Sequence, residues 1–403
     1  MKRKLILLMA VMMIIALLAA CAGQTAPAAP TEPAAPAEPA TPAEPAAPTE
    51  PTEPTAPAAD SGLTMDSVRI WYMHGGDPSD QGFVFRQYTG FENTMAELGL
   101  SDDQVMHAFH IRPGDDVDTS ILEAVEWGAD IIIGGTIGHG PHMLEAAEAH
   151  PDVVFLHATG NLALPSGLPN FHNFFGDMAS ARYLSGIAAG LKTETNVIGF
   201  VAAFLNSEVI TGFTGFYLGA LSVNPDVTML VGEIGSFNDP AREEQIATAL
   251  ADLGADVIGQ HANSPTVQIA AEAAGVWGIG YNNDMIPFAP NATLVSPMFD
   301  WGVYFTHAIR TLVAGQPLEI DFLGTLNDGM VTLSEFNEML IVPGTVEAIE
   351  EARQRIMGGW SVFTGPIYAE DGTQILAEGE VFIEPQAAPS WNHIIQGITV
   401  VGD

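Results

Sequence analysis

Two stretches of this chain, 128–133 and 254–258, have nearly the same sequence, Gly-Ala-Asp-Ile-Ile-Ile and Gly-Ala-Asp-Val-Ile. Each contains a short apolar run that does not alternate with polar residues and is separated from the next run by a stretch with helical spacing. Such runs are typical of strands in a parallel sheet that is covered on both faces. Two similar halves, about 125 residues apart, therefore predict an α/β fold with two doubly wound parallel-sheet lobes.

The same pattern recurs along both halves. The first half is expected to hold strands over 68–73, 127–134 and 153–157 and a helix over 90–98. The second half is expected to hold strands over 197–201, 253–258 and 275–280 and a helix over 213–221. Ligands of such sheets bind beyond the carboxyl ends of the strands. The loops that follow these strands are therefore where a site is expected.

The N-terminus has the form of a secretory signal. A basic start, Met1-Lys2-Arg3-Lys4, is followed by an apolar run and then by Leu18-Ala19-Ala20-Cys21, which resembles the bacterial lipobox. We expect residues 1–20 to be a lipoprotein signal peptide and Cys21, the only cysteine, to be lipidated. Residues 21–65 are mostly Ala, Pro, Thr and Glu, a composition that predicts a disordered linker. The folded part would then lie outside the cytoplasm, held to the membrane by lipid.

The charge balance excludes several functions. The chain has 12 basic and 49 acidic residues and a formal charge of −37, which repels nucleic acid and leaves few arginines for a phosphorylated ligand. There is no G-x-S-x-G motif and no lysine near the loops, so we expect no enzyme and no cofactor. His139, His142 and Glu145 have a spacing that a metal site can use, but such spacing is common by chance and we expect no metal.

The loops after the expected strands carry carboxylate, amide and aromatic groups in both halves. These groups suit a neutral, ring-shaped molecule with polar edges, held between the lobes. For each single residue, a role in a turn or in the core weighs about equally. The ligand-binding candidates are Asp80, Phe83, Phe85, Gly138, Glu208, Asn263, Ser264, Asp284, Asp300 and Trp301.

From residue 68 onward, the chain resembles the basic membrane protein family of substrate-binding lipoproteins, in its purine- and nucleoside-binding branch. The resemblance is carried by 155–160, 180–186, 222–225, 237–240, 254–258, 260–265 and 300–302. It implies a type I periplasmic-binding-protein fold, a monomer that delivers its ligand to an ABC permease, and closure of two lobes about a hinge. The lobes would comprise 66–173 with 301–320, and 174–300 with 321–403.

The resemblance also bears on the ligand. The run Asp80-Gln81-Gly82-Phe83-Val84-Phe85 is similar to the Asp-x-Gly-Trp-x-Tyr of the purine-base branch, and it lacks the asparagine of the nucleoside binders. It implies that Phe83 and Phe85 stack on the ligand, that Trp301 lines the site, and that polar groups read the ring edge. These polar groups are Asp80, Glu208, Asn263 and Asp284. We expect a purine base or a purine nucleoside; another small neutral ligand, or a sensor on the same fold, are the alternatives.

Overall fold

The computed structural model of this protein describes residues 62–402. The expected signal peptide, the lipidation site Cys21 and most of the expected linker lie outside the described residues. The last part of that linker, 62–65, is described. There, Gln104 Nε2 donates to the Met65 carbonyl over 2.9 Å, and the Met65 side chain packs against the core. The folded body therefore begins a few residues before the expected boundary.

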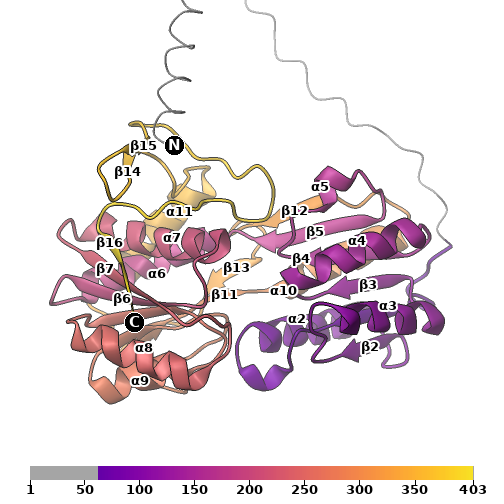
Figure 1. Cartoon of the computed structure of the whole chain (residues 1–403), viewed down its shortest axis with the longest axis horizontal. Helices are drawn as coiled ribbons and strands as arrows, with labels where there is room; N and C mark the ends of the chain where they lie inside the picture. Colours follow the sequence, from indigo (N-terminus) through magenta and orange to yellow (C-terminus); the bar gives the residue numbers. More distant parts are fainter. Residues whose placement is uncertain (1–61, 403) are drawn as a thin grey trace, which may run out of the picture. The chain divides into compact units, whose positions relative to one another are not determined.

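A six-stranded, wholly parallel sheet forms the first lobe (Figure 1). In sheet order its strands are β12 (Asp321–Gly324), β5 (Phe171–Gly176), β4 (Val154–Ala158), β3 (Ile131–Gly134), β1 (Ile70–Met73) and β2 (Val105–Ala108). Its helices are α2 (Phe83–Leu98), α3 (Asp115–Trp127), α4 (Gly140–Ala149) and α10 (Trp301–Val313), with the short helices η1 (Pro78–Asp80), η2 (Ile137–His139) and α5 (Ala163–Ser166). Successive residues of β3 pack alternately into two apolar clusters, one on each face of the sheet.

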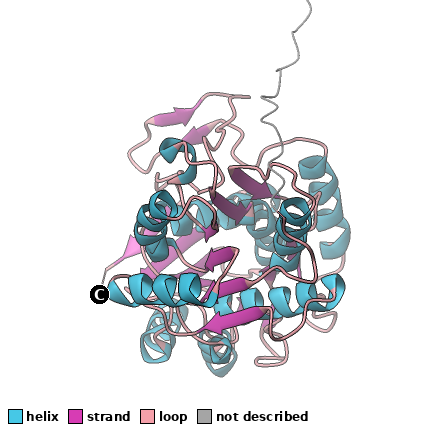
Figure 2. Ribbon diagram, turned by 90° about the vertical axis from the view of Figure 1, so that its right-hand side faces the viewer, coloured by secondary structure: helices cyan, strands magenta, loops and turns pink. Residues whose placement is uncertain are grey.

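A second six-stranded parallel sheet forms the second lobe. In sheet order its strands are β10 (Thr293–Val295), β9 (Trp277–Ile279), β8 (Val257–His261), β6 (Val197–Ala202), β7 (Thr228–Glu233) and β16 (Ile398–Val401). Its helices are α6 (Met178–Lys192), α7 (Ser207–Val223), α8 (Pro240–Asp252), α9 (Thr266–Ala274) and α11 (Thr345–Met357). Figure 2, in which the first lobe faces the viewer, shows helices on both sides of the strands. The α/β fold class predicted from the repeated apolar runs is confirmed.

The chain crosses between the lobes three times, and two crossings lie a few residues beyond the expected bounds. Expected boundaries after residues 173 and 320 would assign the end of β5 and all of β12 to the second lobe. Instead, Phe174 and Phe175 continue β5 and pair with Phe322 and Leu323 of β12 in the first sheet. Two short antiparallel pairs complete the fold: β11 (Pro297–Phe299) with β13 (Val331–Leu333), and β14 (Ile367–Tyr368) with β15 (Gln374–Leu376).

Helices α6 and α7 approach each other more closely than side chains would allow. A Cβ atom added to Gly219 of α7 would overlap the Tyr183 carbonyl oxygen of α6, and one added to Gly186 would overlap the Phe216 carbonyl. Small residues are therefore what permits this contact between the two backbones. Within residues 62–402, no helix is both long enough and apolar enough to cross a membrane.

Because three histidines of the first lobe are buried, we expect the free energy of unfolding to fall as the pH is lowered. Burial lowers the pKa values of His107, His139 and His157 to about 4 each. Between pH 6.5 and about 4, these three imidazoles are protonated in the unfolded chain but remain neutral in the folded protein. The free energy of unfolding should fall by up to about 1.4 kcal/mol per pH unit for each histidine. Above pH 6.5 both states are neutral, and the histidines contribute no pH dependence. Chemical denaturation at a series of pH values measures this slope.

One variant isolates the histidine contribution from that of the many carboxylates. His157 is 1% exposed, and its Nε2 lies 3.0 Å from the Thr136 carbonyl oxygen. In His157→Gln, an amide nitrogen that does not titrate replaces Nε2. Its stability should therefore depend less steeply on pH than that of the parent between pH 6.5 and 4. The same change at the exposed His393 is the control and should leave the slope unaltered. Equal slopes for all three proteins would contradict this assignment.

Candidate functional site

A cavity of about 440 Å³ lies between the carboxyl ends of strands of both sheets. From the first lobe it is lined by residues that follow β1, β2, β3 and β4 and by the start of α2. From the second lobe it is lined by the start of α7 and by residues at and after the ends of β7 and β8. The polar and aromatic side chains among them are Asp77, Ser79, Asp80, Phe83, His110, Thr136, Thr159, Glu208, Ser236, Phe237, Asn238, His261 and Asn263. The cavity is therefore at the position where doubly wound sheets hold their ligands.

Asp80 fixes the start of helix α2 at the edge of this cavity. Its Oδ1 accepts from the backbone N–H groups of Gly82 (2.9 Å) and Phe85 (3.0 Å), and its Oδ2 from that of Val84 (3.0 Å). Burial raises the pKa of Asp80, while the backbone hydrogen bonds oppose the rise. A carboxylate has about four acceptor positions, so one remains for a ligand. Asp80 therefore orients the first turn of α2 and keeps some capacity to bind.

Of the two phenylalanines expected to stack on a ligand, only Phe83 lines the cavity. Both lie in the first turn of α2, not in the loop that the sequence suggested. Residues two apart on a helix point about 200° apart, so Phe85 faces away when Phe83 faces the cavity. Trp301 does not line it either, because it is 0% exposed and stacks on Phe299 at 4.5 Å. It meets Phe83 edge to face at 5.5 Å and supports that ring from behind.

The other candidates that lie away from the cavity have local structural contacts. Gly138 packs against Pro113, where a Cβ atom would overlap the ring. The Ser264 hydroxyl donates to the buried Glu243 carboxylate. Asp284 Oδ1 accepts from the Ile286 N–H (3.0 Å), and Asp300 Oδ1 accepts from the Gly302 N–H (3.2 Å) at the start of α10. Of the candidates, the structure brings together Asp80, Phe83, Glu208 and Asn263.

Glu208 and His261 lie side by side in the cavity wall of the second lobe. Glu208 lies in the first turn of α7, where the Asn206 side chain accepts from the Val209 N–H over 3.1 Å. Its Oε1 lies 3.5 Å from His261 Nε2, and Tyr281 Oη lies 3.3 Å from the same nitrogen. Burial lowers the pKa of His261, so its imidazole is neutral at neutral pH. This wall therefore offers a carboxylate acceptor and a neutral ring.

Sequence reasoning missed His261, Phe237 and Asn238 as lining residues. His261 is the last residue of β8. The sequence pattern placed it just after an expected strand, which is where ligand-binding residues were expected. Phe237 and Asn238 follow β7, a strand that the sequence analysis did not identify. The partly polar spacing of that strand, Thr-Met-Leu-Val-Gly-Glu, hides it from a search for continuous apolar runs.

The two lobes touch beside the cavity. A Cβ atom added to Gly82 of the first lobe would overlap the Asn263 carbonyl oxygen of the second lobe. The backbones therefore meet directly, and the lobes are closed on each other at this point. Glycine at position 82 is what permits so close an approach.

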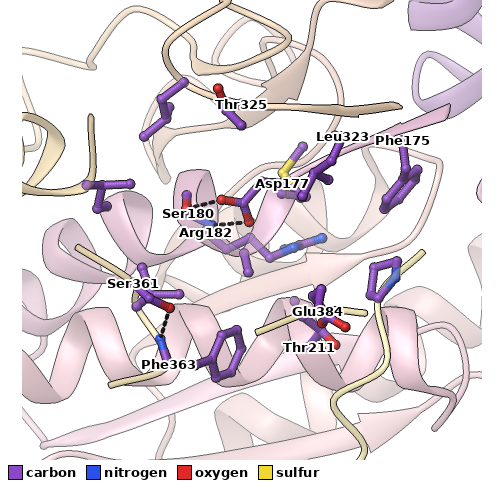
Figure 3. Close-up of a pocket in the computed structure, with 18 of the residues that line it drawn as sticks. Phe175, Asp177, Ser180, Arg182, Thr211, Leu323, Thr325, Ser361, Phe363 and Glu384 are labelled. Atoms are coloured by element: carbon purple, nitrogen blue, oxygen red, sulfur yellow. Dashed lines mark hydrogen bonds between the residues drawn. The ribbon is translucent and has the colours of Figure 1, made fainter. Parts of the chain in front are cut away.

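Figure 3 shows a second cavity, of about 320 Å³. Glu208 and His261 line both the first cavity and this one. It lies beside the crossings between the lobes and is lined by the ends of β5 and β12 and by residues that follow α11. Among the ten candidates from the sequence, Glu208 alone lines it. It is therefore a separate feature from the expected site.

Comparison with known proteins identifies the family. The model of the Bmp family, described as PnrA-like ABC transporter substrate-binding proteins, matches residues 75–362. The chain belongs to this family. Its members are substrate-binding proteins and not enzymes, and they act outside the cytoplasm with ABC permeases as partners. The family expected from the sequence motifs is thus confirmed.

Individual relatives have different names. A purine-binding protein of Brucella abortus is 28% identical over 337 residues, which cover 83% of this chain and 93% of that protein. A Haloferax volcanii protein, provisionally named an ABC transporter glucose-binding protein, is 33% identical and covers 80% of this chain and 85% of its own. A solute-binding protein of Conexibacter woesei superposes with a TM-score of 0.60 at 20% identity, over 73% of this chain and 97% of that one. The periplasmic-binding-protein fold is therefore confirmed.

Proposed function

We propose that the protein captures a purine base or a purine nucleoside in the cavity between its lobes. The observation that carries this proposal is the pair Phe83 and Phe237, one from each lobe, which line the same cavity. Their rings offer flat faces to a flat ligand, and one aromatic contact contributes about 0.5–1.5 kcal/mol beyond burial. A ligand that touches both phenylalanines favours the closed arrangement of the lobes.

The polar lining suits the edge of a neutral purine. Asp80 and Glu208 accept hydrogen bonds from ring and amino N–H groups, and the Asn263 amide both donates and accepts. Within residues 62–402, no lysine or arginine lines this cavity, which disfavours a phosphorylated nucleotide. The relative from Brucella abortus, named for purine binding, supports the same ligand class.

A sugar is the second candidate. Asp77, Asn238 and Ser236 line the same cavity as Asp80 and Glu208, and such groups hydrogen-bond the hydroxyls of a neutral sugar. The name of the Haloferax volcanii relative favours this alternative. The two ligands differ in their need for aromatic faces, which makes Phe83 the residue that separates them.

We also propose that Cys21 is lipidated and that the linker after it lets the folded body move while it stays at the membrane. An extended Pro-rich chain spans about 3.1 Å per residue, enough for the body to reach a permease. A ligand sensor with the same anchor is the alternative, and the identity of the neighbouring genes would distinguish the two.

Calorimetric titration tests the ligand class. The protein is titrated with adenine, guanine, hypoxanthine, adenosine, guanosine and glucose. We expect saturable binding of at least one of the five purines and none of glucose. Binding of glucose with no purine bound would overturn the purine proposal in favour of the sugar.

Two matched variants test the assigned role of Phe83. Phe83→Ala should weaken purine binding at least tenfold, because it removes an aromatic face from the cavity. Phe85→Ala, two residues along the same helix, should change the affinity by less than about twofold because Phe85 faces away. Titration gives both affinities, and thermal melting shows whether each variant is folded. Equal losses in the two variants would mean that they act through the stability of α2 and not through the ligand.

A further inference from the structure

We propose a second small-molecule site in the cavity of about 320 Å³, which takes a neutral molecule with an apolar body and a polar end. Residues 358–397, between α11 and β16, form one wall of this cavity and are termed the C-terminal strap. The other walls come from the ends of β5 and β12 in the first lobe and from α6 and α7 in the second. This site goes beyond the proposed function, which uses the other cavity.

The C-terminal strap is fixed to both lobes. The Ala387 N–H donates to Asp321 Oδ2 of β12 over 2.7 Å, and Thr211 Oγ1 of α7 donates to the Trp391 carbonyl over 3.2 Å. Trp391 is buried, and its ring lies 4.9 Å from that of Phe363. The C-terminal strap therefore packs around its own aromatic side chains and forms a stable wall of the cavity.

Arg182 gives the cavity unused hydrogen-bond donors. Its side chain is buried at 1% exposure, with Nη1 donating to the Gln260 carbonyl (2.9 Å) and the guanidinium 3.9 Å from the Tyr281 ring centroid. Nε and Nη2 have no partner among the described residues. Figure 3 shows the side chain extending between Asp177 on one side and Thr211 and Glu384 on the other. Because unpaired buried donors are costly, a ligand oxygen or ring nitrogen near Arg182 would be stabilised.

The charges around Arg182 select a neutral ligand. Among the described residues, Arg182 is the only lysine or arginine that lines the cavity, whereas Asp177, Glu208 and Glu384 are all acidic. An anion would meet more negative than positive charge, and a cation such as an amidinium has no acceptor atom for the unpaired Arg182 donors. Glu384 Oε1 is buried and without a partner among the described residues, so it can accept from an N–H or O–H of the ligand.

The remaining lining selects an apolar body. Aromatic and aliphatic side chains cover the rest of the wall, among them Phe175, Met178, Trp360 and Phe363. A flat ring with a carboxamide fits this combination, since its carbonyl faces Arg182 and its N–H₂ faces Glu384. The chemical class is therefore a neutral aromatic or heteroaromatic amide.

Three isosteric probes test the site on the full-length protein. Benzamide is neutral, benzoate is anionic and benzamidine is cationic, with the same ring and nearly the same size. We expect benzamide to bind with a Kd on the order of 1 mM, as its few atoms allow, and the two ions to bind at least about tenfold more weakly. Ligand-observed NMR and calorimetry give the affinities. Preferential binding of either ion would overturn the proposal, as would no binding of benzamide.

Two variants locate the bound probe. Leu323 lines the cavity and is 38% exposed, so the Leu323→Trp variant should fold. The larger side chain should fill part of the cavity, and benzamide binding should fall at least about tenfold. Leu122→Trp, at an exposed position of α3 outside the cavity, is the matched control and should bind as the parent does. Phe83→Ala should also bind benzamide as the parent does. A loss of benzamide binding in Phe83→Ala, with none in Leu323→Trp, would place the probe in the other cavity and overturn the second site.

Discussion

Gly82→Ala should weaken ligand binding at least about 100-fold, equivalent to about 3 kcal/mol, while the melting temperature changes by only a few degrees. The added methyl group would overlap the Asn263 carbonyl oxygen across the cleft. The lobes would have to stay apart at this edge, so a ligand bound to one lobe would lose contacts with the other. The substitution acts on the closed form, because open lobes leave room for the methyl group.

The neighbouring glycine provides the control for this prediction. A Cβ atom on Gly76, which lines the same cavity, would lie 3.6 Å from Val84 Cγ2, an ordinary contact distance. Gly76→Ala should therefore retain an affinity within a fewfold of the parent. Small-angle scattering with saturating ligand should show a larger radius of gyration for Gly82→Ala than for Gly76→Ala. An unaltered affinity in Gly82→Ala would show that the lobes need not meet at this point.

Gly219→Ala should lower the free energy of unfolding by about 3 kcal/mol, at the upper end for an overpacked interior. In an isolated helix the same change is favourable by about 1 kcal/mol, because glycine is a poor helix former. Here the methyl group would overlap the Tyr183 carbonyl and force α6 and α7 apart along their whole contact. Because this contact forms the interior of the second lobe, the cost exceeds the gain in helix propensity.

Chemical denaturation of Gly219→Ala measures this effect. Ser222→Thr, which adds one methyl group to an exposed position of the same helix, is the control and should change stability by less than about 0.5 kcal/mol. If Gly219→Ala had the same free energy of unfolding as the parent, α6 and α7 would be able to move apart with little loss of stability. The backbone contact would then not be a source of stability.

Much of the fold could be predicted because each buried strand of a parallel sheet is a nearly continuous apolar run. Ile131–Gly134 and Val257–His261 were found in this way. Strand β2, Val-Met-His-Ala, and strand β7, with its terminal glutamate, were missed, since they carry polar residues and lie toward the edge of their sheets. The last strand, β16, is Ile-Thr-Val-Val, a typical strand composition, but local composition gives no signal that it pairs with β7, which lies about 170 residues earlier in the chain.

The site was harder to predict because side-chain direction depends on where a helix begins. The three glycines before Phe83 suggested a long loop, but the Asp80 carboxylate binds the first backbone N–H groups of α2, which starts at Phe83 itself. That start turns Phe85 away from the cavity. Trp301 looked like a lining residue because it follows a strand, but it begins α10 and packs beneath Phe83. Strand ends thus located the site, and helix starts decided which residues line it.

The interleaved path of the chain governs the order in which the protein can be completed. The first sheet lacks its edge strand until β12 (Asp321–Gly324) has been made, and the second lacks its own until β16 (Ile398–Val401). Neither lobe is one continuous segment, so the first sheet cannot be completed before most of the second lobe has been made, and the second sheet cannot be completed before β16 has been made. A polypeptide that leaves the cytoplasm through a narrow channel must remain unfolded until it has crossed. Closing strands that come late in the chain delay the completion of both sheets, which favours such a crossing.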